Sequence, residues 1–579
     1  MAKRNPTIRI LAGLAALALV FAGSVAVAQT LPRNQTLYIG GHQWGPPTNF
    51  NPLSSNPAWP VGGSGQMGIN GDGYIFETLF LSNIVNGSHA PLLGKDMSWT
   101  TPTQLTVHLQ PGTMWQDGQP LTSADVKFTF ELGKDFSVST TALWDYLSSI
   151  DTPDAQTVVF NLDPARPNPG VVERYVDTVY ILPQHIWQAV ADQGQSALLQ
   201  FENFDPVGSG SYKVMSHSAE QIVLERYDNY WGKSLYGMPT PKYVVHPIFK
   251  SNDAGNLALQ QGQLDWSQQF VPNVWTMKNV GTWLSSEPYY IPGSIPMMLV
   301  NVQRKGLDNV LVRRALAYSI NYPLIAQTAM SRYSEPAKSS LIIPTGVESQ
   351  YFDANTVDQY GWSYDPAKAK DILENQLHAT KGSDGIYVLP DGTKLSFVAQ
   401  TPYGWTDWMA ALQVVSQSAK AVGIDVTTNF PQAPVDINDV QTGNFDLALF
   451  YISGVGPDAP WARFRDMMDD RSVPPMGQNA FWDYNRYSNP AVPALLDKAG
   501  AATSVADKKA AYAALDKIFM QDVPGILTAP HSRPLKGTRC RQPSAGTCSP
   551  SSPGTSSPWW PPSASTSSCP AWCPATPST

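Results

Sequence analysis

The sequence predicts a mixed α/β (α+β) fold for the body of the chain, because strand and helix patterns alternate along it without a repeat. Residues 105–109 alternate apolar and polar side chains as a half-buried strand does, and a turn is expected at Gln116–Gln119. Thr122–Asp125 then begins a helix with a sequence like that of a capping box. Strand patterns also follow helical ones, at 424–428 and 445–451. We therefore expect several sheets accompanied by helices.

The other elements are predicted from the spacing of apolar residues. The sequences Thr-Val-Val-Phe-Asn-Leu at 157–162 and Gln-Ile-Val-Leu-Glu-Arg at 221–226 are typical of strands. Apolar residues that recur every three or four positions predict helices with one buried face. These helices are expected at 309–320, 366–377, 406–422 and 505–520.

Residues 1–28 have the composition of a secretory signal peptide. Three basic residues precede an apolar run over 10–22, and the cleavage-type sequence Ala26-Val27-Ala28 follows. The alternative, a membrane anchor, requires about 20 apolar residues, and this run is shorter. No cysteine follows the run, so it offers no residue for lipid attachment. We therefore expect a soluble exported protein located in the periplasm.

The segment 535–579 differs abruptly from the rest of the chain. It has nine Pro, eleven Ser, six Thr and no acidic residue, and it contains all four cysteines. With so few aliphatic side chains it cannot offset its ordering entropy by burial, so we expect it to be disordered. The cysteine spacing does not match that of a zinc site. Two interpretations stay open: a natural disordered tail, or a shifted reading frame, so that the segment is not the native C-terminus.

The body between these two ends is acidic and free of cysteine. Each end carries three positive and no negative charges, so the formal charge of −8 for the whole chain becomes −14 for the body. An acidic body without a dense Lys/Arg run excludes the nucleic-acid-binding classes. The 506 residues from Gln29 to Pro534 are enough for two to four lobes of about 100–200 residues. Their stability must come from large cores, because no disulfide is available.

Known catalytic motifs are missing from the body. The sequence contains no G-x-S-x-G, H-E-x-x-H, P-loop or helix-opening G-x-G-x-x-G motif, and no two histidines are four residues apart. The acidic run Asp466–Asp470 is expected to form a solvated helix face rather than an acid/base pair. We therefore predict no catalytic residue, no metal and no cofactor. The alternative is a secreted hydrolase acting on peptides or glycans through an unrecognised site.

Six sequence motifs, in order along the chain, resemble those of one family. The segment Val107–Phe128, VHLQPGTMWQDGQPLTSADVKF, is similar to the hallmark segment of the family 5 extracytoplasmic solute-binding proteins, the oligopeptide/dipeptide-binding group of ABC importers. The resemblance extends from about residue 36 to residue 534. The other five motifs are NFNPL at 49–53, ILPQHIW at 181–187, DPVGSGSYKV at 205–214, VRRALAY at 312–318 and RYSNP at 486–490.

The resemblance implies a two-lobed periplasmic-binding-protein fold with a hinge. The first lobe would span 29–270, with an inserted subdomain at 76–200, and would be completed by about 527–534. The second lobe would span 271–526. A peptide or oligosaccharide-like solute would bind between the lobes, and the closed protein, a monomer, would deliver it to an ABC permease at the inner membrane. The partner ATPase would supply the energy.

The resemblance also implies where the ligand binds. Peptide-binding relatives pair the ligand's amino terminus with an Asp, and alignment on Gly456-Pro457-Asp458 puts Ser453 at that position; a shift of up to two residues gives Gly454 or Val455. A buried ammonium without an anion costs several kcal/mol. Aromatic rings stack well on sugar rings, and the body is rich in Trp. The predicted ligand-binding residues are Trp44, Trp405, Tyr451, Ser453, Asp458, Trp461 and Trp482.

Overall fold

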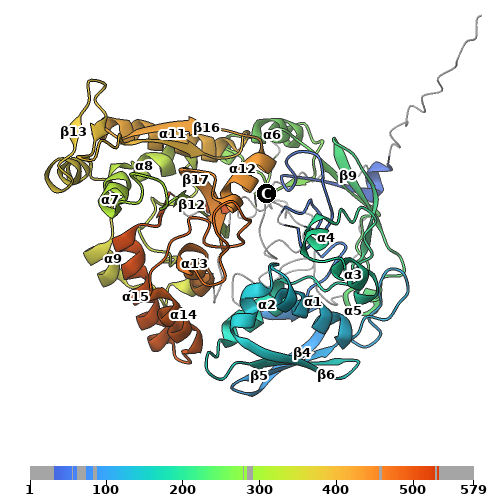
Figure 1. Cartoon of the computed structure of the whole chain (residues 1–579). Coiled ribbons are helices and arrows are strands. Elements are labelled where there is room, and N and C mark those ends of the chain that lie inside the picture. The colour runs from blue at the N-terminus through green and yellow to red at the C-terminus, as the bar shows by residue number, and fades with distance from the viewer. Residues whose placement is uncertain are drawn as a thin grey trace, which may run out of the picture.

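The computed structural model describes residues 31–54, 56–61, 73–82, 88–277, 280–282, 291–454, 459–528 and 531–533. The predicted signal peptide at 1–28 and the segment 535–579 lie outside these described residues and stay predictions. The described chain forms two lobes, one on each side of the molecule (Figure 1). No helix in the described ranges is both long enough and apolar enough to cross a membrane.

The first lobe is built on a five-stranded mixed sheet with the order β11-β1-β10-β9-β8. The first strand, β1, pairs in parallel with β10 and β11, whereas β8, β9 and β10 are antiparallel neighbours. The strands are β1 (Thr36–Gly40), β8 (Tyr212–His217), β9 (Gln221–Arg226), β10 (Tyr243–Pro247) and β11 (Trp266–Ser267). The helices near this sheet in the chain are α5 (Lys233–Tyr236) and α6 (Asn252–Gln260).

Between β1 and β8 the chain forms a second sheet at the far end of the first lobe, and we call residues 80–200 the inserted subdomain (Figure 1). Its four strands are antiparallel in the order β4-β5-β7-β6, and helices α1 and α2 cover the inner face. These four strands are β4 (Gly94–Thr101), β5 (Gln104–Leu109), β6 (Leu147–Asp154) and β7 (Thr157–Leu162), and a separate antiparallel pair is formed by β2 (Phe80–Ser82) and β3 (His89–Pro91). The helices are α1 (Ser123–Asp135), the 3₁₀ helix η2 (Thr141–Asp145), α2 (Pro169–Thr178), α3 (Gln184–Ala191) and α4 (Gln195–Gln200).

The second lobe contains a mixed sheet with the order β16-β15-β17-β12-β18. The central strand β17 is buried along its whole length, so helices and loops cover both faces of the sheet there. The strands are β12 (Ile291–Val300), β15 (Ser396–Gln400), β16 (Asp425–Asn429), β17 (Leu447–Ile452), β18 (Gly525–Leu527) and β19 (His531–Arg533); a separate hairpin is formed by β13 (Thr380–Lys381) and β14 (Tyr387–Val388).

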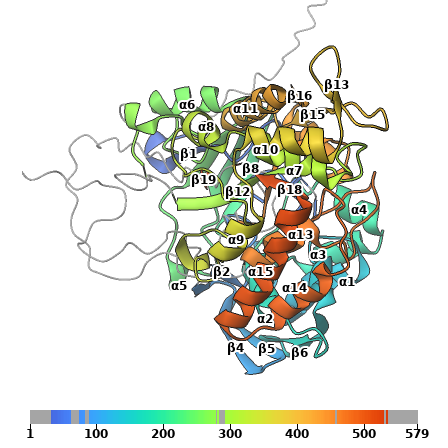
Figure 2. The ribbon, with the colours of Figure 1, turned by 90° about the vertical axis from the view of Figure 1, so that its left-hand side faces the viewer.

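The helices of the second lobe surround this sheet, and α13, α14 and α15 pack together on the side that faces the inserted subdomain (Figure 2). Helices α7, α10 and α11 pack on one another farther from the inserted subdomain. The helices are α7 (Val310–Ser319), α8 (Tyr322–Leu324), α9 (Ala354–Tyr360), α10 (Pro366–Asp371), α11 (Thr406–Val422), α12 (Ala433–Thr442), α13 (Ala459–Met468), α14 (Val492–Ala501) and α15 (Val505–Asp522).

The C-terminal strands differ from the sequence-based expectation. Residues 527–534 were expected to complete the first lobe, but β18 and β19 both pair antiparallel with β12 in the second lobe. The chain reverses after α15 at Val523, which has a φ of 48°, and then runs back along β12. Ile526 and Leu527 of β18 are buried in the same hydrophobic core as Met297–Leu299 of β12, so packing as well as strand pairing holds β18 beside that strand. The other predicted lobe boundaries stay predictions.

The local elements agree closely with the sequence patterns. Strands β7 and β9 and helix α11 have the predicted bounds, 157–162, 221–226 and 406–422. Thr122 caps α1 in a complete capping box with Asp125. The Thr122 side chain accepts a hydrogen bond from the backbone of Asp125, and the Asp125 side chain accepts one from the backbone nitrogen of Thr122. Gly118 in the predicted turn has a φ of 88°, a conformation that favours glycine.

Glycine is required at position 208 because of close backbone packing and not because of a positive φ. A Cβ at this position would lie 1.9 Å from the backbone oxygen of Ile75, so the two segments pack too closely for any side chain. We expect Gly208→Ala to lower the free energy of unfolding by at least about 2 kcal/mol, since backbone atoms must move apart. Gly382→Ala is the control, because its nearest atom is a side-chain oxygen of exposed Asp384 at 3.0 Å. Urea denaturation of both variants measures the difference; equal losses would contradict the explanation.

Candidate ligand-binding cleft

A cleft lies between the two lobes and takes its walls from both. It contains about 1170 Å³ of space that no protein atom occupies, part of which is open to solvent. The first lobe contributes Pro52–Ser54, Pro57, Val61 and residues of the helices α1 and α2, and the second lobe contributes the end of β17, residues of helix α13, Phe481 and Tyr484. A ligand in this cleft would therefore touch both lobes at once.

Helix α2 presents the first-lobe wall of the cleft. The helix begins at Pro169, and the side chain of Asn168 caps it by accepting a hydrogen bond from the backbone nitrogen of Val171 at 3.2 Å. Arg174, Tyr175 and Thr178 line the cleft. Their spacing places them on one face of the helix.

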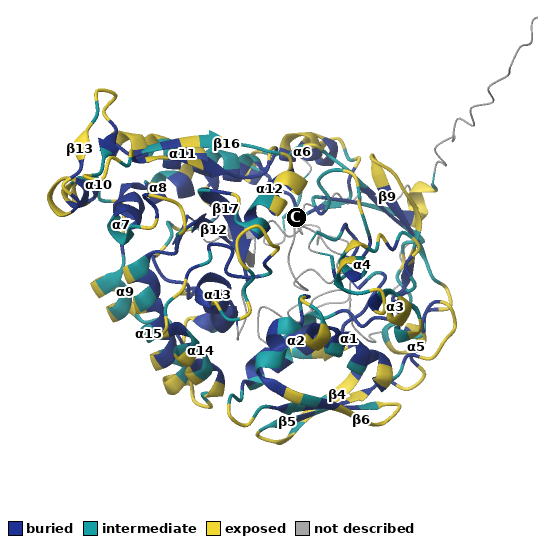
Figure 3. Cartoon of the chain, viewed as in Figure 1, coloured by how far each residue is buried: buried dark blue, intermediate teal, exposed yellow. Residues whose placement is uncertain are grey.

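The opposite wall is formed where β17 ends. Tyr451 and Ser453 line the cleft from this strand end, and every residue of the adjacent helix α13 is buried (Figure 3). The backbone nitrogen of Ser453 donates to Asp466 Oδ2 at 2.8 Å, and Arg174 Nη2 donates to Ser453 Oγ at 3.1 Å. The second bond joins the two lobes directly across the cleft.

Arg465 and Asp466 form a buried ion pair in the same wall. Arg465 Nη2 lies 2.8 Å from Asp466 Oδ1, and Arg465 Nη1 donates to the hydroxyl of Tyr175 at 3.2 Å across the lobes. Burial by itself lowers the pKa of Arg465, but Asp466 and Tyr175 outweigh that effect and the pKa is raised. Arg465 is therefore a fixed positive charge, and both oxygens of Asp466 are already engaged.

The acidic run 466–470 was expected to be solvated, and this expectation is wrong for part of it. Asp466 is 7% exposed and Asp469 is 3% exposed. Each is buried because an arginine pairs with it, Arg465 with Asp466 and Arg471 with Asp469. Paired charges of this kind cost far less to bury than isolated ones.

Two of the predicted ligand-binding residues line the cleft. Tyr451 and Ser453 lie at the end of β17, where the sequence motif placed them. The ring of Tyr451 stacks on Trp405, with ring centroids 6.0 Å apart and planes at 23°. Asp458 lies outside the described residues, so its placement stays a prediction.

The four predicted tryptophans are not among the described residues that line the cleft. Trp405 lies against Tyr451 and thus supports a cleft residue. Trp461 is buried and donates its indole nitrogen to the carbonyl of Leu496 at 3.0 Å. The ring of Trp482 lies 5.3 Å from the guanidinium carbon of Arg465, and Trp44 is half-buried against the core.

The sequence patterns did not identify several residues of the cleft. Arg174, Tyr175 and Tyr180 come from the inserted subdomain, and Phe481 and Tyr484 from a loop of the second lobe. A capping signal at Asn168-Pro169 could have located α2 in the sequence, but no local pattern says which face of the helix meets the other lobe. No group of three or more His, Cys, Asp or Glu that could hold a metal occurs in the described part of the chain.

Comparisons with known proteins agree with this architecture. The model of the bacterial extracellular solute-binding proteins, family 5, middle region, matches residues 90–466. A probable peptide-binding protein YejA from Agrobacterium fabrum is 24% identical over 454 residues, 72% of each chain. A glutathione-binding protein GsiB from Pectobacterium atrosepticum is 26% identical over 437 residues, 73% of this chain and 76% of its own.

Solved structures show the same fold. A periplasmic oligopeptide-binding protein from Thermotoga maritima, crystallised with bound mannohexaose, is 31% identical, with a TM-score of 0.81 over 88% of this chain and 93% of its own. The oligopeptide-binding protein AppA from Bacillus subtilis, in complex with a nonapeptide, has a TM-score of 0.71 at 20% identity, over 87% and 93% of the two chains. These matches confirm the predicted two-lobed fold and the resemblance carried by the six motifs. The chain belongs to the bacterial extracellular solute-binding proteins of family 5.

Proposed function

We propose that this solute-binding protein captures an oligosaccharide in the cleft and delivers it, outside the cytoplasm, to the permease of an ABC importer. The observation that carries the choice of ligand is the chemistry of the cleft wall. Asp466 is the one carboxylate among the described residues that line the cleft, and Arg465 and the Ser453 backbone already occupy its oxygens. A free peptide amino terminus would have to compete with these partners for an anion.

The other lining groups suit a sugar. Tyrosines at 175, 180, 451 and 484 and the phenyl ring of Phe481 provide aromatic surface, and Ser453, Thr178 and Gln441 provide short polar groups. Sugar rings present apolar faces and hydroxyl edges, so they need both kinds of contact. The Thermotoga maritima protein bound to mannohexaose supports the same ligand class.

The arrangement of the lobes supports capture by closure. Besides the cleft contacts, the backbone nitrogen of Asn252 in α6 donates to the carbonyl of Gly404, just before α11, at 2.9 Å. The lobes thus also touch beside the cleft. A ligand that contacts both walls binds the closed form more tightly and shifts the population toward it. The closed monomer would then dock on the permease, and the ATPase subunits would supply the energy for import.

A peptide is the second candidate ligand. The curated relatives are named for peptide and glutathione binding, and Arg174 provides a guanidinium in the cleft that suits a carboxylate. The two candidates differ in the charge of the ligand, so binding measurements separate them directly.

Calorimetric titration with mannohexaose, cellohexaose, a tripeptide, a tetrapeptide and glutathione tests the proposal. We expect one of the two hexasaccharides to bind with a Kd of about 1 μM or lower and the peptides to bind at least tenfold more weakly. Tyr451→Ala is expected to weaken sugar binding by about tenfold or more, because it removes an aromatic ring and a hydroxyl that line the cleft. Tyr403→Ala, whose ring is 51% exposed and does not line the cleft, is the matched control.

Tight peptide binding without a response to either sugar would show that the choice of ligand is wrong. Turnover of a peptide or glycan by the purified protein would instead favour the secreted hydrolase. Circular dichroism of each variant checks that a loss of binding does not reflect unfolding.

A further inference from the structure

The lobes also meet outside the ligand cleft, where Tyr146 crosses from the inserted subdomain to the second lobe. Tyr146 follows the 3₁₀ helix η2 and is 2% exposed. Its hydroxyl accepts a hydrogen bond from Arg471 Nη2 at 3.0 Å and faces Asp497 Oδ1 at 3.4 Å. Both partners belong to the second lobe, so opening the lobes would remove both.

Two carboxylates of the second lobe fix Arg471, the residue that binds the Tyr146 hydroxyl. Arg471 Nε lies 2.9 Å from Asp469 Oδ1, and Arg471 Nη1 lies 2.8 Å from Asp497 Oδ1. The guanidinium is therefore fixed between two carboxylates of its own lobe, with one Nη2 hydrogen directed to Tyr146. Because the arginine is oriented in advance, binding the tyrosine hydroxyl requires little further ordering.

Aromatic packing surrounds the same tyrosine. The ring of Tyr146 meets the ring of Trp461 edge to face, with centroids 5.4 Å apart and planes at 79°. The guanidinium carbon of Arg471 lies 5.9 Å from the centre of the Tyr146 ring. Such an edge-to-face pair contributes beyond its buried area. None of Tyr146, Trp461 and Arg471 is among the described residues that line the cleft.

Helices α2 and α14, next to this contact, also pack closely on each other. A Cβ on Gly500 of α14 would lie 2.6 Å from the side chain of Asn168, which caps α2. A narrow crevice between α2 and α14 is lined by Val171 and Trp461. The first and second lobes are thus packed together here, and the Tyr146 contact is part of a continuous interface.

We propose that Tyr146 is a latch that stabilises the closed arrangement of the lobes whatever ligand occupies the cleft. Its ring packs on Trp461, its hydroxyl contacts Arg471 and Asp497, and Asp469 orients the arginine. The latch would make Tyr146 an affinity-determining residue that never touches the ligand. A ligand that needs the closed form binds with an apparent Kd that rises as the closed population falls. The proposal rests on closure by a two-lobed binding protein and is independent of whether the ligand is a sugar or a peptide.

Tyr146→Phe in the full chain is the test, because it keeps the ring against Trp461 and removes only the hydroxyl. Tyr212→Phe is the matched control, since the Tyr212 hydroxyl donates to the carbonyl of Pro241 at 2.7 Å within the first lobe. We expect Tyr146→Phe to increase the ligand-free radius of gyration in small-angle scattering and to raise the Kd by about tenfold, the loss typical of a hydrogen bond to a charged group. The factor should be the same for mannohexaose and for a tetrapeptide, whichever of the two binds.

Two results would overturn the latch. In the first, Tyr146→Phe matches Tyr212→Phe in both radius of gyration and affinity, which means that the contact persists when the lobes open. In the second, both hexasaccharide and peptide bind but only one loses affinity, which means that Tyr146 acts on a ligand directly. If neither probe binds, the proposed ligand class fails, and the scattering of the ligand-free variants still decides whether the latch exists.

Discussion

Replacing Arg463 with methionine is expected to lower the free energy of unfolding by about 3–5 kcal/mol, because it removes the arginine whose charge neutralises the buried carboxylate of Glu348. Both side chains are completely buried, and Arg463 forms an ion pair with Glu348 through Nη1 and Nη2. Breaking such a pair by removing one partner is far more damaging than losing an exposed pair, whose contribution is about 0–1 kcal/mol.

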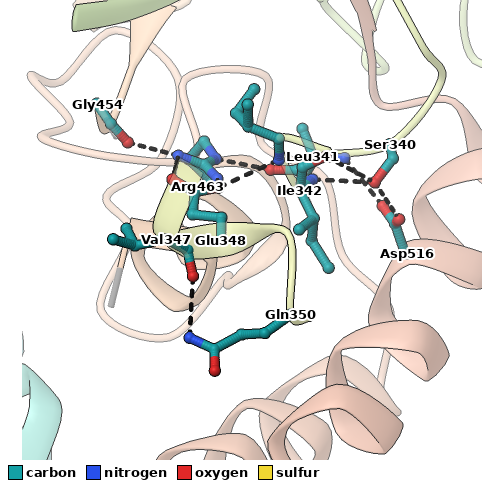
Figure 4. Close-up of polar contacts among 10 residues, drawn as sticks. Ser340, Leu341, Ile342, Val347, Glu348, Gln350, Gly454, Arg463 and Asp516 are labelled. Atoms are coloured by element: carbon teal, nitrogen blue, oxygen red, sulfur yellow. Dashed lines mark hydrogen bonds and ion pairs between the residues drawn. The ribbon is translucent and has the colours of Figure 1, made fainter. Parts of the chain in front are cut away.

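The surroundings of Arg463 show why its loss also reaches the cleft (Figure 4). Its Nε donates to the carbonyl of Leu341 at 2.6 Å, and Nη1 donates to the carbonyl of Gly454. Gly454 directly follows Ser453, so the guanidinium fixes the chain where it leaves β17 and lines the cleft. Asp516 holds the segment at Leu341 from the other side, because its Oδ1 accepts a hydrogen bond from the backbone nitrogen of Leu341 at 3.0 Å.

Urea denaturation measures the effect, with the slope of the unfolding free energy against urea concentration compared between the proteins. Lys394→Met is the control, because its ion pair with Asp384 is about half exposed on both sides. The double variant Arg463→Met/Glu348→Leu should recover part of the lost stability, since neither charge of the ion pair remains buried. A loss for Arg463→Met no larger than that for Lys394→Met would contradict the assignment of Arg463–Glu348 as a buried pair.

The protein is expected to lose stability as the pH rises from 5 to 8, in part because of Glu77. Glu77 is fully buried in the first lobe, and burial raises its pKa to about 7, although hydrogen bonds from Tyr230 and Trp231 oppose the rise. The unfolded chain loses this proton near pH 4.5, whereas the folded protein keeps it until about pH 7. Between these values the unfolded state gains charge first, so unfolding becomes easier as the pH rises.

Glu77→Gln removes the titrating group and keeps a side chain of the same shape. Between pH 5 and pH 8, the stability of the unmodified protein should fall by about 2–3 kcal/mol more than that of the variant, because each pKa unit corresponds to 1.36 kcal/mol. Glu220→Gln, at an exposed position, is the control. Denaturation curves at several pH values measure the difference, and parallel pH profiles for Glu77→Gln and the unmodified protein would refute it.

Much of the fold was predictable because its determinants are local. The β7 sequence at 157–162 alternates side chains that face the core and the surface, and the structure buries its second, fourth and sixth residues. Helix α11 ends at Gly423 with a φ of 96°, as a glycine after a periodic stretch predicts. Along the predicted helix at 366–377, α10 passes at Ile372 into a π-helical turn, which apolar spacing does not reveal.

The cleft was predictable only in part. Tyr451 and Ser453 were found because they lie in a motif that resembles the family pattern, and the motif fixes their place after a strand. Arg174 and Tyr175 carry no such motif. They reach the cleft because α2 of the inserted subdomain faces α13 of the second lobe, a contact between residues almost 300 positions apart.

The sequence by itself determined the mixed α/β class, the bounds of several elements and, through its six ordered motifs, the family. These depend on neighbours in the chain: periodic burial, capping side chains and turn residues. Only the tertiary structure decided that Asp466 and Asp469 are buried beside arginines, that β18 and β19 join the second lobe, and that Tyr146 reaches Arg471. The partners of β18, β19 and Tyr146 are distant in sequence. The arginines beside Asp466 and Asp469 are near in sequence, but the burial of these pairs depends on the elements packed around them. Burial and lobe contact are properties of packing rather than of any local pattern.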